Sequence, residues 1–451
     1  QLSALDVKAT LENFDRALHA DITSIAAEPF QPVFDWTGAT NTEKNSLETI
    51  GKDAIRCGTV GAVILSGGQG TRLGFSGPKG VYDIGLPSKK SIFQLHIERI
   101  LKVRQLCPKE DGSLPSIPVY IMTSDLNHQI IIDFFKANNF FGFPESDLFF
   151  FEQALELCLS KDGKIIVESP TSLSLAPDGN GGLFTALKTS GALGDIAARG
   201  VQHLHAYGID NVLTKSIDPA FVGLCIRDNA HCGNKVVSRL HKDEKVGVTV
   251  LREGRMFIAE YSELPADIAS AADENGTLLF NAANICNHYF NVQFLIDVLL
   301  PGLSGIYHLA SKKIPYMNAD GATVTPDVAN GYKLELFIFD GFPLAEQFTV
   351  MSVDRQEEFA PVKNSPEATS DSPVTARAMM TRQAIRWLRN AGASLQWTNA
   401  DATVIPVETP EFEDAVQKGL VSCEISPLVS YCGEGLESYA GRTVSLPASL
   451  Q

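Results

Sequence analysis

The sequence predicts an α/β fold in which helices flank a mostly parallel sheet. Between residues 60 and 211, short runs of β-branched and aromatic residues alternate with longer segments whose apolar residues recur at helical spacing. A glycine-rich turn follows the first of these runs, at the position where open α/β sheets bind their ligands. Between residues 234 and 261 the apolar runs leave no room for helices, which predicts an antiparallel extension of the sheet.

The individual elements follow in chain order. Residues 1–58 are expected to be mainly helical, with a break in the proline-containing stretch 26–36. Strands are predicted at residues 60–65, 117–123, 147–153 and 202–211. Helices are predicted between them at residues 91–107, 126–139 and 181–193. Ser91 is suited to cap the first of these helices, because its hydroxyl can accept a hydrogen bond from an unpaired backbone N–H.

The last part of the chain has a different pattern. Residues 366–393 begin as a polar, proline-bearing stretch and continue as a helix, and short strand-like pieces follow to the end. We therefore expect an N-terminal helical segment (1–58), a central α/β domain (59–358) and a small C-terminal α+β domain (359–451).

Composition and charge restrict the class of protein. The 451 residues are 44% hydrophobic and 20% charged, no apolar run reaches the roughly 18 residues of a membrane span, and no signal-peptide pattern opens the chain. The eight cysteines include no C-x-x-C pair, which favours free thiols and a cytoplasmic protein. A net charge of −16 argues against nucleic acid and membrane partners, so an anionic ligand would need a local cluster of cations.

The stretch "LSGGQGTRLGFSGPKG" at residues 65–80 provides such a combination of glycines and cations. Its sequence fits neither the Walker loop nor the G-x-G-x-x-G dinucleotide fingerprint. Glycines let backbone N–H groups approach phosphate oxygens closely. The alternative is a glycine-rich connection whose cations face water, but the coincidence of strand, glycines and cations favours a phosphate site at Gly67, Gly68, Gly70, Arg72 and Lys79.

This stretch resembles the signature L-x-x-G-x-G-T-R-[LM]-x, followed by P-K, of the nucleotidyltransferases that join a sugar 1-phosphate to a nucleoside triphosphate. The resemblance covers about residues 60–392 through "HAYGIDN", "EYSE", "FNAANICNHYF", "NGYKLELFIFD" and "EEFAPVKN", which are similar to blocks of the UDP-N-acetylhexosamine pyrophosphorylases. It implies a Rossmann-like, GT-A-like nucleotidyltransferase fold.

Two polar residues after strands match family positions. Asp210 matches the metal-binding aspartate, and a carboxylate completed by waters and phosphates suits Mg²⁺, with Mn²⁺ as a substitute; the alternative is a loop-capping aspartate. Gln153 matches the residue that binds uracil, whose edge needs a donor and an acceptor together. The alternative is a surface glutamine, and the following "ALELCL" departs from the family pattern.

The resemblance also assigns the sugar side. Gly179 and Asn180 match nucleoside and sugar contacts, and Glu260 and Asn284 match residues that bind sugar hydroxyls. Ala283 stands where the family usually has glycine.

Two lysines match family residues that reach the phosphates, Lys333 and Lys363, although lysines beside apolar residues more often extend along the surface to water. Lys363 lies near the expected domain boundary, so we expect it to enter the site only when the C-terminal domain closes. With Arg72 and Lys79, these lysines form the expected catalytic set.

The reaction implied is the formation of UDP-N-acetylglucosamine and pyrophosphate from UTP and N-acetylglucosamine 1-phosphate. The sugar phosphate is already ionised, so no general base is required. Glucose, galactose or N-acetylgalactosamine 1-phosphate are alternative substrates, and a non-catalytic nucleotide-sugar sensor is an alternative of another class. A monomer or a weak homodimer fits the sequence equally.

Overall fold

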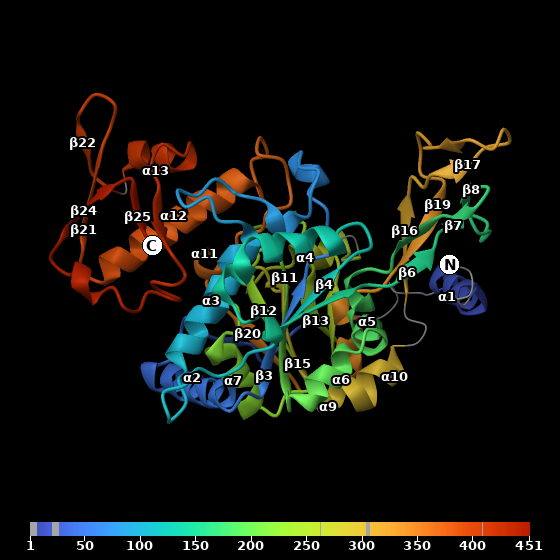
Figure 1. Ribbon diagram of the computed structural model, residues 1–451, viewed down its shortest axis with the longest axis horizontal. Helices are drawn as coiled ribbons and strands as arrows, with labels where there is room; N and C mark the ends of the chain where they lie inside the picture. Colours follow the sequence, from blue (N-terminus) through green and yellow to red (C-terminus); the bar gives the residue numbers. More distant parts are fainter. Residues whose placement is uncertain (1–6, 20–26, 262, 304–306, 408) are drawn as a thin grey trace.

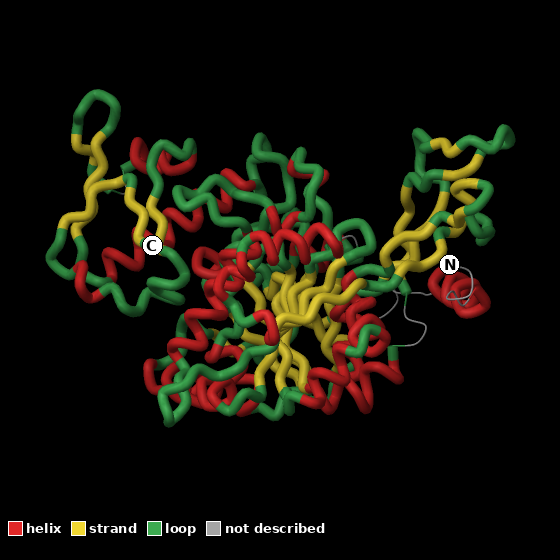
Figure 2. The backbone as a smooth tube through the Cα atoms, in the orientation of Figure 1, coloured by secondary structure: helices red, strands yellow, loops and turns green. Residues whose placement is uncertain are grey.

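The centre of the molecule is an 11-stranded mixed sheet. In the computed structural model, the described residues are 7–19, 27–261, 263–303, 307–407 and 409–451. Four parallel strands form one half of the sheet, and Figure 2 shows helices on both sides of it. They are β11 (His203–Gly208), β3 (Val60–Leu65), β4 (Val119–Thr123) and β5 (Leu148–Glu152). Every residue of β3 and β4 is buried, as expected for strands covered on both faces.

The other half of the sheet contains the antiparallel pairing. β15 (Ala282–Asn291) runs antiparallel to both β11 and β12 (Cys232–Ser238). Strands β20 (Phe348–Ser352) and β2 (Phe34–Asp35) continue the sheet parallel to β12. The antiparallel extension is confirmed for β13 (Val248–Arg252) and β14 (Arg255–Ala259), which pair with one another; β13 also pairs with β1 (Glu28–Pro29) and β15. β12 pairs with β15 instead of β13, because β15 arrives from later in the chain and lies between β12 and β11.

Helices occupy most of the predicted positions. They include α3 (Ile92–Leu106), α4 (His128–Ala137), α5 (Leu183–Thr189), α6 (Ala192–Ala198) and α7 (Pro219–Arg227). The N-cap is confirmed, since the Ser91 hydroxyl accepts a hydrogen bond from the Gln94 N–H at 3.2 Å. The single helix expected over 181–193 is wrong, because the chain turns at Gly191 (φ +84°) between α5 and α6. Shorter helices are α8 (Ala266–Ser270), α9 (Val292–Phe294), α10 (Leu300–Gly302) and α11 (Arg355–Glu358).

The helix α2 (Asn41–Arg56) packs closely on α7 through glycines. A Cβ built on Gly51 would lie 1.9 Å from the Pro219 carbonyl oxygen, and one on Gly223 would lie 1.9 Å from the Leu47 carbonyl oxygen. Neither helix could therefore carry a larger side chain at this crossing without moving its neighbour.

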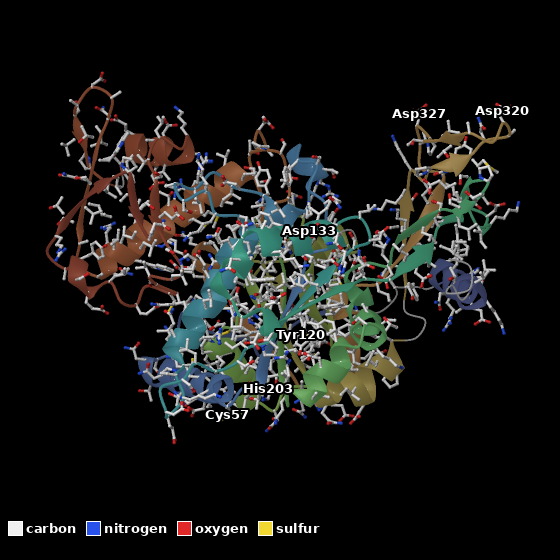
Figure 3. The ribbon with its side chains drawn as sticks, in the orientation of Figure 1. Cys57, Tyr120, Asp133, His203, Asp320 and Asp327 are labelled. Carbon is white, nitrogen blue, oxygen red and sulfur yellow. The ribbon has the colours of Figure 1, made fainter. Side chains whose placement is uncertain are left out.

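A second group of strands forms an arm beside the main sheet, visible on the right of Figure 1 and mostly extended chain in Figure 2. Segments 155–177 and 308–335 build it, and α1 (Val7–His19) lies against it with the Phe14 and Tyr332 rings 6.0 Å apart. Figure 3 shows Asp320 and Asp327 at its tip. Its strands are β6 (Leu155–Leu157), β7 (Leu159–Ser160), β8 (Val167–Ser169), β9 (Ser172–Leu173), β10 (Leu175–Pro177), β16 (His308–Lys312), β17 (Tyr316–Met317), β18 (Thr323–Val324) and β19 (Gly331–Glu335).

Residues 373–451, here called the C-terminal part, lie on the opposite side of the sheet from the arm (Figure 1). They have a hydrophobic cluster of their own. Polar contacts join them to α3: the buried Lys90 ammonium lies 2.7 Å from the Glu98 carboxylate and donates to the Ser426 hydroxyl at 2.8 Å. Their elements are α12 (Pro373–Asn390), α13 (Pro410–Gln417), β21 (Ser394–Thr398), β22 (Val404–Ile405), β23 (Cys423–Ile425), β24 (Thr443–Leu446) and β25 (Ala448–Leu450).

Candidate active site

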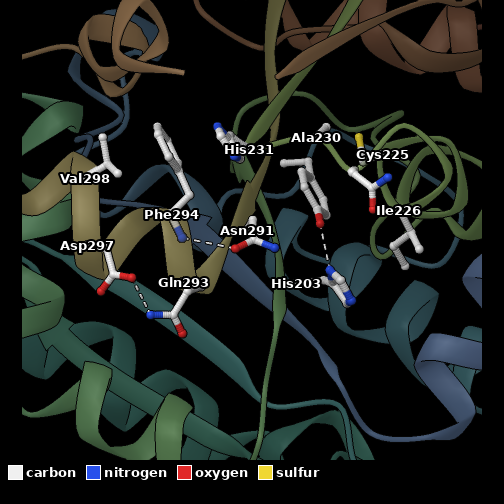
Figure 4. Close-up of a pocket in the computed structure, with 12 residues that line it drawn as sticks. His203, Cys225, Ile226, Ala230, His231, Asn291, Gln293, Phe294, Asp297 and Val298 are labelled. Atoms are coloured by element: carbon white, nitrogen blue, oxygen red, sulfur yellow. Dashed lines mark hydrogen bonds between the residues drawn. The ribbon is translucent and has the colours of Figure 1, made fainter. Parts of the chain in front are cut away.

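Two large cavities lie near opposite ends of the sheet. One of about 380 Å³, drawn in Figure 4, contains His203, the first residue of β11. Its polar groups are partly engaged with one another, as in the 2.7 Å hydrogen bond between the His203 ring and the Tyr289 hydroxyl. Among the residues that the structure describes, its lining includes no lysine or arginine, so this cavity is unsuited to a triphosphate.

The other cavity, of about 580 Å³, lies where β3 and β11 end. The carboxyl ends of these parallel strands meet at the same edge, so the turns after them come together. Most of the residues predicted for the site line this cavity, from segments spread over almost 300 positions of the chain. They are Gly67, Gly68, Lys79, Gln153, Gly179, Asn180, Asp210, Glu260, Asn284 and Lys363.

The glycine loop folds back on itself at the mouth of this cavity. The Gly70 N–H donates to the Gly77 carbonyl at 3.0 Å, and the Lys79 N–H donates to the Gly68 carbonyl at 3.3 Å. A Cβ on Gly68 would meet no heavy atom within 4 Å, so its backbone is open to a ligand. Gly70 is buried and does not line the cavity; a Cβ there would come within 2.8 Å of the Phe75 ring, so its glycine serves the turn.

The two charged groups nearest to one another in the cavity are Lys79 and Asp210. The ammonium lies 3.8 Å from the carboxylate, and both side chains are largely buried. Burial lowers the pKa of Lys79, Asp210 opposes that shift, and the nearby Lys363 and Arg72 add to it. The site therefore gathers positive charge, although the chain as a whole carries −16.

The nucleoside side is shaped by glycines against polar side chains. A Cβ on Gly67 would lie 3.0 Å from the Gln153 amide nitrogen, which places that amide against the glycine loop. Gly179 has φ +89°, and a Cβ there would lie 2.3 Å from the Leu336 carbonyl oxygen. The Asn180 side-chain oxygen accepts the Ile338 N–H at 3.0 Å, which fixes its orientation.

Glu260 directly follows β14 and Asn284 lies on β15, and both come close to Gly247, the residue before β13. The Asn284 N–H donates to the Gly247 carbonyl at 2.8 Å, and a Cβ on Gly247 would lie 3.0 Å from a Glu260 oxygen. Burial and the neighbouring Glu263 raise the pKa of Glu260. Ala283, the departure from the family pattern, is fully buried opposite Val248 and does not line the cavity.

Lys363 already reaches the cavity in this structure, with the C-terminal part packed against α3. Its segment pairs with the turn after β11, because the Val362 N–H donates to the Asp210 carbonyl at 2.9 Å and residues 211 and 361 form a β-bridge. Closure of a domain is therefore not needed to bring Lys363 to the site, which corrects our expectation.

Two predicted cations lie outside the lining. Arg72 is exposed in the short helix of the glycine loop, close enough to lower the pKa of Lys79. Lys333 lies on β19 of the arm, opposite Ala310 and close enough to Cys158 to affect the pKa of that thiol. The structure does not bring Lys333 to the cavity, and its role stays a prediction.

The cavity also contains residues that the sequence did not single out. Lys245 is an exposed cation at its edge, and Cys286, Phe337 and Phe339 form part of its wall. The "LFIFD" run could have indicated two aromatic side chains on one face, whereas Lys245 stands in an ordinary polar loop with no signal of its own. Cys286 has φ +53°, a strained conformation for a residue with a side chain, and it lies within β15 beside the site.

The donor set fits a magnesium ion that is completed by substrate. Among the described residues no three His, Cys, Asp or Glu side chains gather as metal ligands. Asp210 projects a partly exposed carboxylate into the cavity, and Mg²⁺ characteristically takes one or two carboxylates together with phosphates and waters.

The mixed, mostly parallel sheet and its flanking helices form an α/β nucleotidyltransferase fold, and a glycine-rich loop borders its cavity. Residues 20–407 match the family model described as UTP--glucose-1-phosphate uridylyltransferase, and the chain belongs to this family.

Individual relatives cover nearly the whole chain. A UDP-N-acetylhexosamine pyrophosphorylase-like protein 1 from Xenopus tropicalis is 40% identical over 97% of this chain and 87% of its own. The UDP-N-acetylglucosamine diphosphorylase 2 of Arabidopsis thaliana is 43% identical over 91% of this chain and 79% of its own. The crystal structure of the uridine diphosphate N-acetylglucosamine pyrophosphorylase from Trypanosoma brucei in complex with inhibitor superimposes with a TM-score of 0.82 at 33% identity, covering 97% of this chain and 87% of that one.

Proposed function

We propose that this protein transfers a uridylyl group from UTP to N-acetylglucosamine 1-phosphate, forming UDP-N-acetylglucosamine and pyrophosphate. One observation carries the proposal: the glycine loop, Lys79, Asp210 and Lys363 line the same cavity as polar residues suited to uracil and sugar. Relatives with 36–43% identity over most of the chain are named for this activity, which supports the same assignment.

In the proposed reaction, a phosphate oxygen of the sugar 1-phosphate attacks the α-phosphorus of UTP. A new P–O bond forms as the bond to the bridging oxygen of the β-phosphate breaks, and pyrophosphate leaves with the electron pair. Lys79 and the glycine-loop N–H groups would hold the triphosphate, and Lys363 would approach it from the opposite segment. Alignment of two bound reactants can contribute about 7–11 kcal/mol to barrier lowering.

Asp210 is the residue we propose as the protein ligand for Mg²⁺, with Mn²⁺ as a substitute. The ion, when bound, would neutralise charge on the phosphates. Chelation with EDTA should abolish activity, and added Mg²⁺ should restore it. Retention of full activity in excess chelator would contradict the assignment.

The direct test is to incubate the purified chain with UTP and N-acetylglucosamine 1-phosphate and to identify both products. UDP-N-acetylglucosamine and pyrophosphate in equal amounts would support the proposal. Binding of the UDP-sugar without either product would favour a sensor.

We also propose that the protein acts in the cytoplasm as a monomer or weak homodimer. No described helix is long and apolar enough to cross a membrane. The eight cysteines are unpaired, which is consistent with a reducing compartment.

A further inference from the structure

A cluster of four charged side chains lies behind the turn that carries Asp210. The buried ion cluster consists of Lys215, Asp218, Lys235 and Glu358. The Lys235 side chain is completely buried, and its ammonium lies 2.5 Å from both an Asp218 and a Glu358 carboxylate oxygen. The other Glu358 oxygen lies 3.2 Å from the Lys215 ammonium. Two positive and two negative charges thus neutralise one another in the interior.

Buried ion pairs seldom add net stability, because desolvation of the charges offsets their attraction. The pKa of Asp218 reflects this balance: burial would raise it, and the ammoniums of Lys235 and Lys215 hold it below its usual value. A cluster of this kind therefore calls for a role other than stability, and its members show which parts of the chain it joins.

Its carboxylates belong to the two segments that form one wall of the site. Asp218 ends the turn that starts after β11, and Glu358 ends α11, five residues before Lys363. Lys235 comes from β12 and links both carboxylates.

Hydrogen bonds extend from the cluster to the site. The Asn211 side chain donates to the Glu358 carbonyl at 2.7 Å and accepts from the Ala360 N–H at 2.9 Å. Asp210 directly precedes Asn211, and its carbonyl accepts a hydrogen bond from the Val362 N–H. Lys363 directly follows Val362. One continuous network therefore sets the distance between the proposed metal ligand and a proposed phosphate-binding lysine.

We propose that the buried ion cluster is a positioning device that holds Asp210 and Lys363 in register for uridylyl transfer. This inference rests on the proposed function for its kinetic readout, because the cluster itself touches no substrate. Small displacements of aligned groups are costly in rate, so loosening the cluster should reduce kcat more than it changes KM.

The test compares two substitutions that each remove one carboxylate from a buried lysine. Glu358→Gln loosens the cluster, and Glu98→Gln loosens the comparably buried Lys90–Glu98 pair, which joins α3 to the C-terminal part away from the cavity. We expect Glu358→Gln to lower kcat by about 10- to 100-fold, while Glu98→Gln stays near wild type. Amide hydrogen exchange should rise at residues 209–213 and 360–363 in Glu358→Gln alone.

A purely structural cluster would give a different result: both variants would lose similar thermal stability and keep wild-type kcat and wild-type exchange in these two segments. Should Glu358→Gln fail to fold, Lys215→Met offers a milder change, because Glu358 then keeps Lys235. A wild-type protein without uridylyltransferase activity would overturn the proposed function, whereas the exchange comparison would still test the positioning role.

Discussion

At the residue scale, the proposed reaction depends on cations that gather at one cavity of a strongly acidic chain. Lys79 is held by the backbone of the glycine loop and faces Asp210 from 3.8 Å. That separation leaves both groups able to exchange their mutual contact for phosphate and metal. Lys363 and Lys245 are the other cations on the wall.

We expect Lys79→Ala to reduce kcat by roughly 100-fold or more, because it removes a preorganised positive charge from the transferring phosphates. Steady-state kinetics measure this, and an unchanged circular dichroism spectrum shows that the fold is intact. Lys136→Ala, at an exposed position on α4, serves as the control and should leave kcat unchanged. A folded Lys79→Ala enzyme with normal turnover would remove Lys79 from the site.

Lys245→Ala should raise the KM for a phosphorylated substrate about threefold to tenfold with a smaller effect on kcat, because the side chain stands at the exposed edge of the cavity. Lys242→Ala, three residues earlier on the same loop and outside the lining, is the matched control. Equal KM changes in the two variants would indicate a general charge effect instead of a contact.

Asp178 lies between two lining residues, and burial, with the nearby Glu156, raises its pKa from 3.8 to about 7. One of its oxygens has no hydrogen-bond partner among the described residues. Since the folded state binds this proton more tightly than the unfolded state, the free energy of unfolding should fall as pH rises from about 4 to 7 and then level off.

Asp178→Asn should abolish this part of the pH dependence. Between pH 4 and 8, its free energy of unfolding should therefore rise relative to that of the wild type by up to about 4 kcal/mol. Urea unfolding at a series of pH values measures the difference. Parallel curves for the two proteins would show that Asp178 keeps an ordinary pKa.

At the element scale, the sequence predicts the four parallel strands best. The runs that form β3, β4, β5 and β11 are short and apolar, and segments with helical periodicity separate them, so local pattern and tertiary environment agree. Turns after these strands could therefore be placed at one edge, which is why the glycine loop, Gln153 and Asp210 meet as expected.

The arm and the position of β15 could not be predicted in this way. Both depend on pairing between segments far apart in the chain, such as Tyr332 with Leu159 and Asn287 with Tyr207, for which a single sequence carries no signal. Lys333 matches a family motif, but its strand belongs to this arm, and the pattern "NGYKLE" does not reveal where the arm lies.

The helix crossing of α2 and α7 gives a test of packing at this scale. Gly51→Ala should destabilise the fold by about 1–3 kcal/mol, because its Cβ would overlap the Pro219 carbonyl. Gly194→Ala in α6 is the control: it is exposed, has no heavy atom within 4 Å of its Cβ and should stabilise by about 0.5–1 kcal/mol. Thermal or urea unfolding distinguishes them, and equal changes in the free energy of unfolding would contradict the close crossing.

At the scale of the whole molecule, the site is built where the central sheet, the turn after β11 and the segment leading to the C-terminal part converge. His96 of α3 donates to the Ile209 carbonyl at 3.2 Å, and the Tyr431 hydroxyl donates to the Ser216 carbonyl at 3.1 Å. The C-terminal part thus contacts the same turn that carries Asp210. Removing the C-terminal part should therefore disturb the position of Asp210 as well as expose the surface that this part covers.

We propose that uridylyl transfer from UTP to N-acetylglucosamine 1-phosphate takes place in this cavity. The most direct measurement is kcat/KM for pyrophosphate release from UTP with four sugar 1-phosphates in parallel: N-acetylglucosamine, N-acetylgalactosamine, glucose and galactose. We predict the highest value with N-acetylglucosamine 1-phosphate. A higher value with glucose 1-phosphate would contradict the assignment of the sugar while keeping the phosphate site, and no release with any of the four would contradict the enzyme itself.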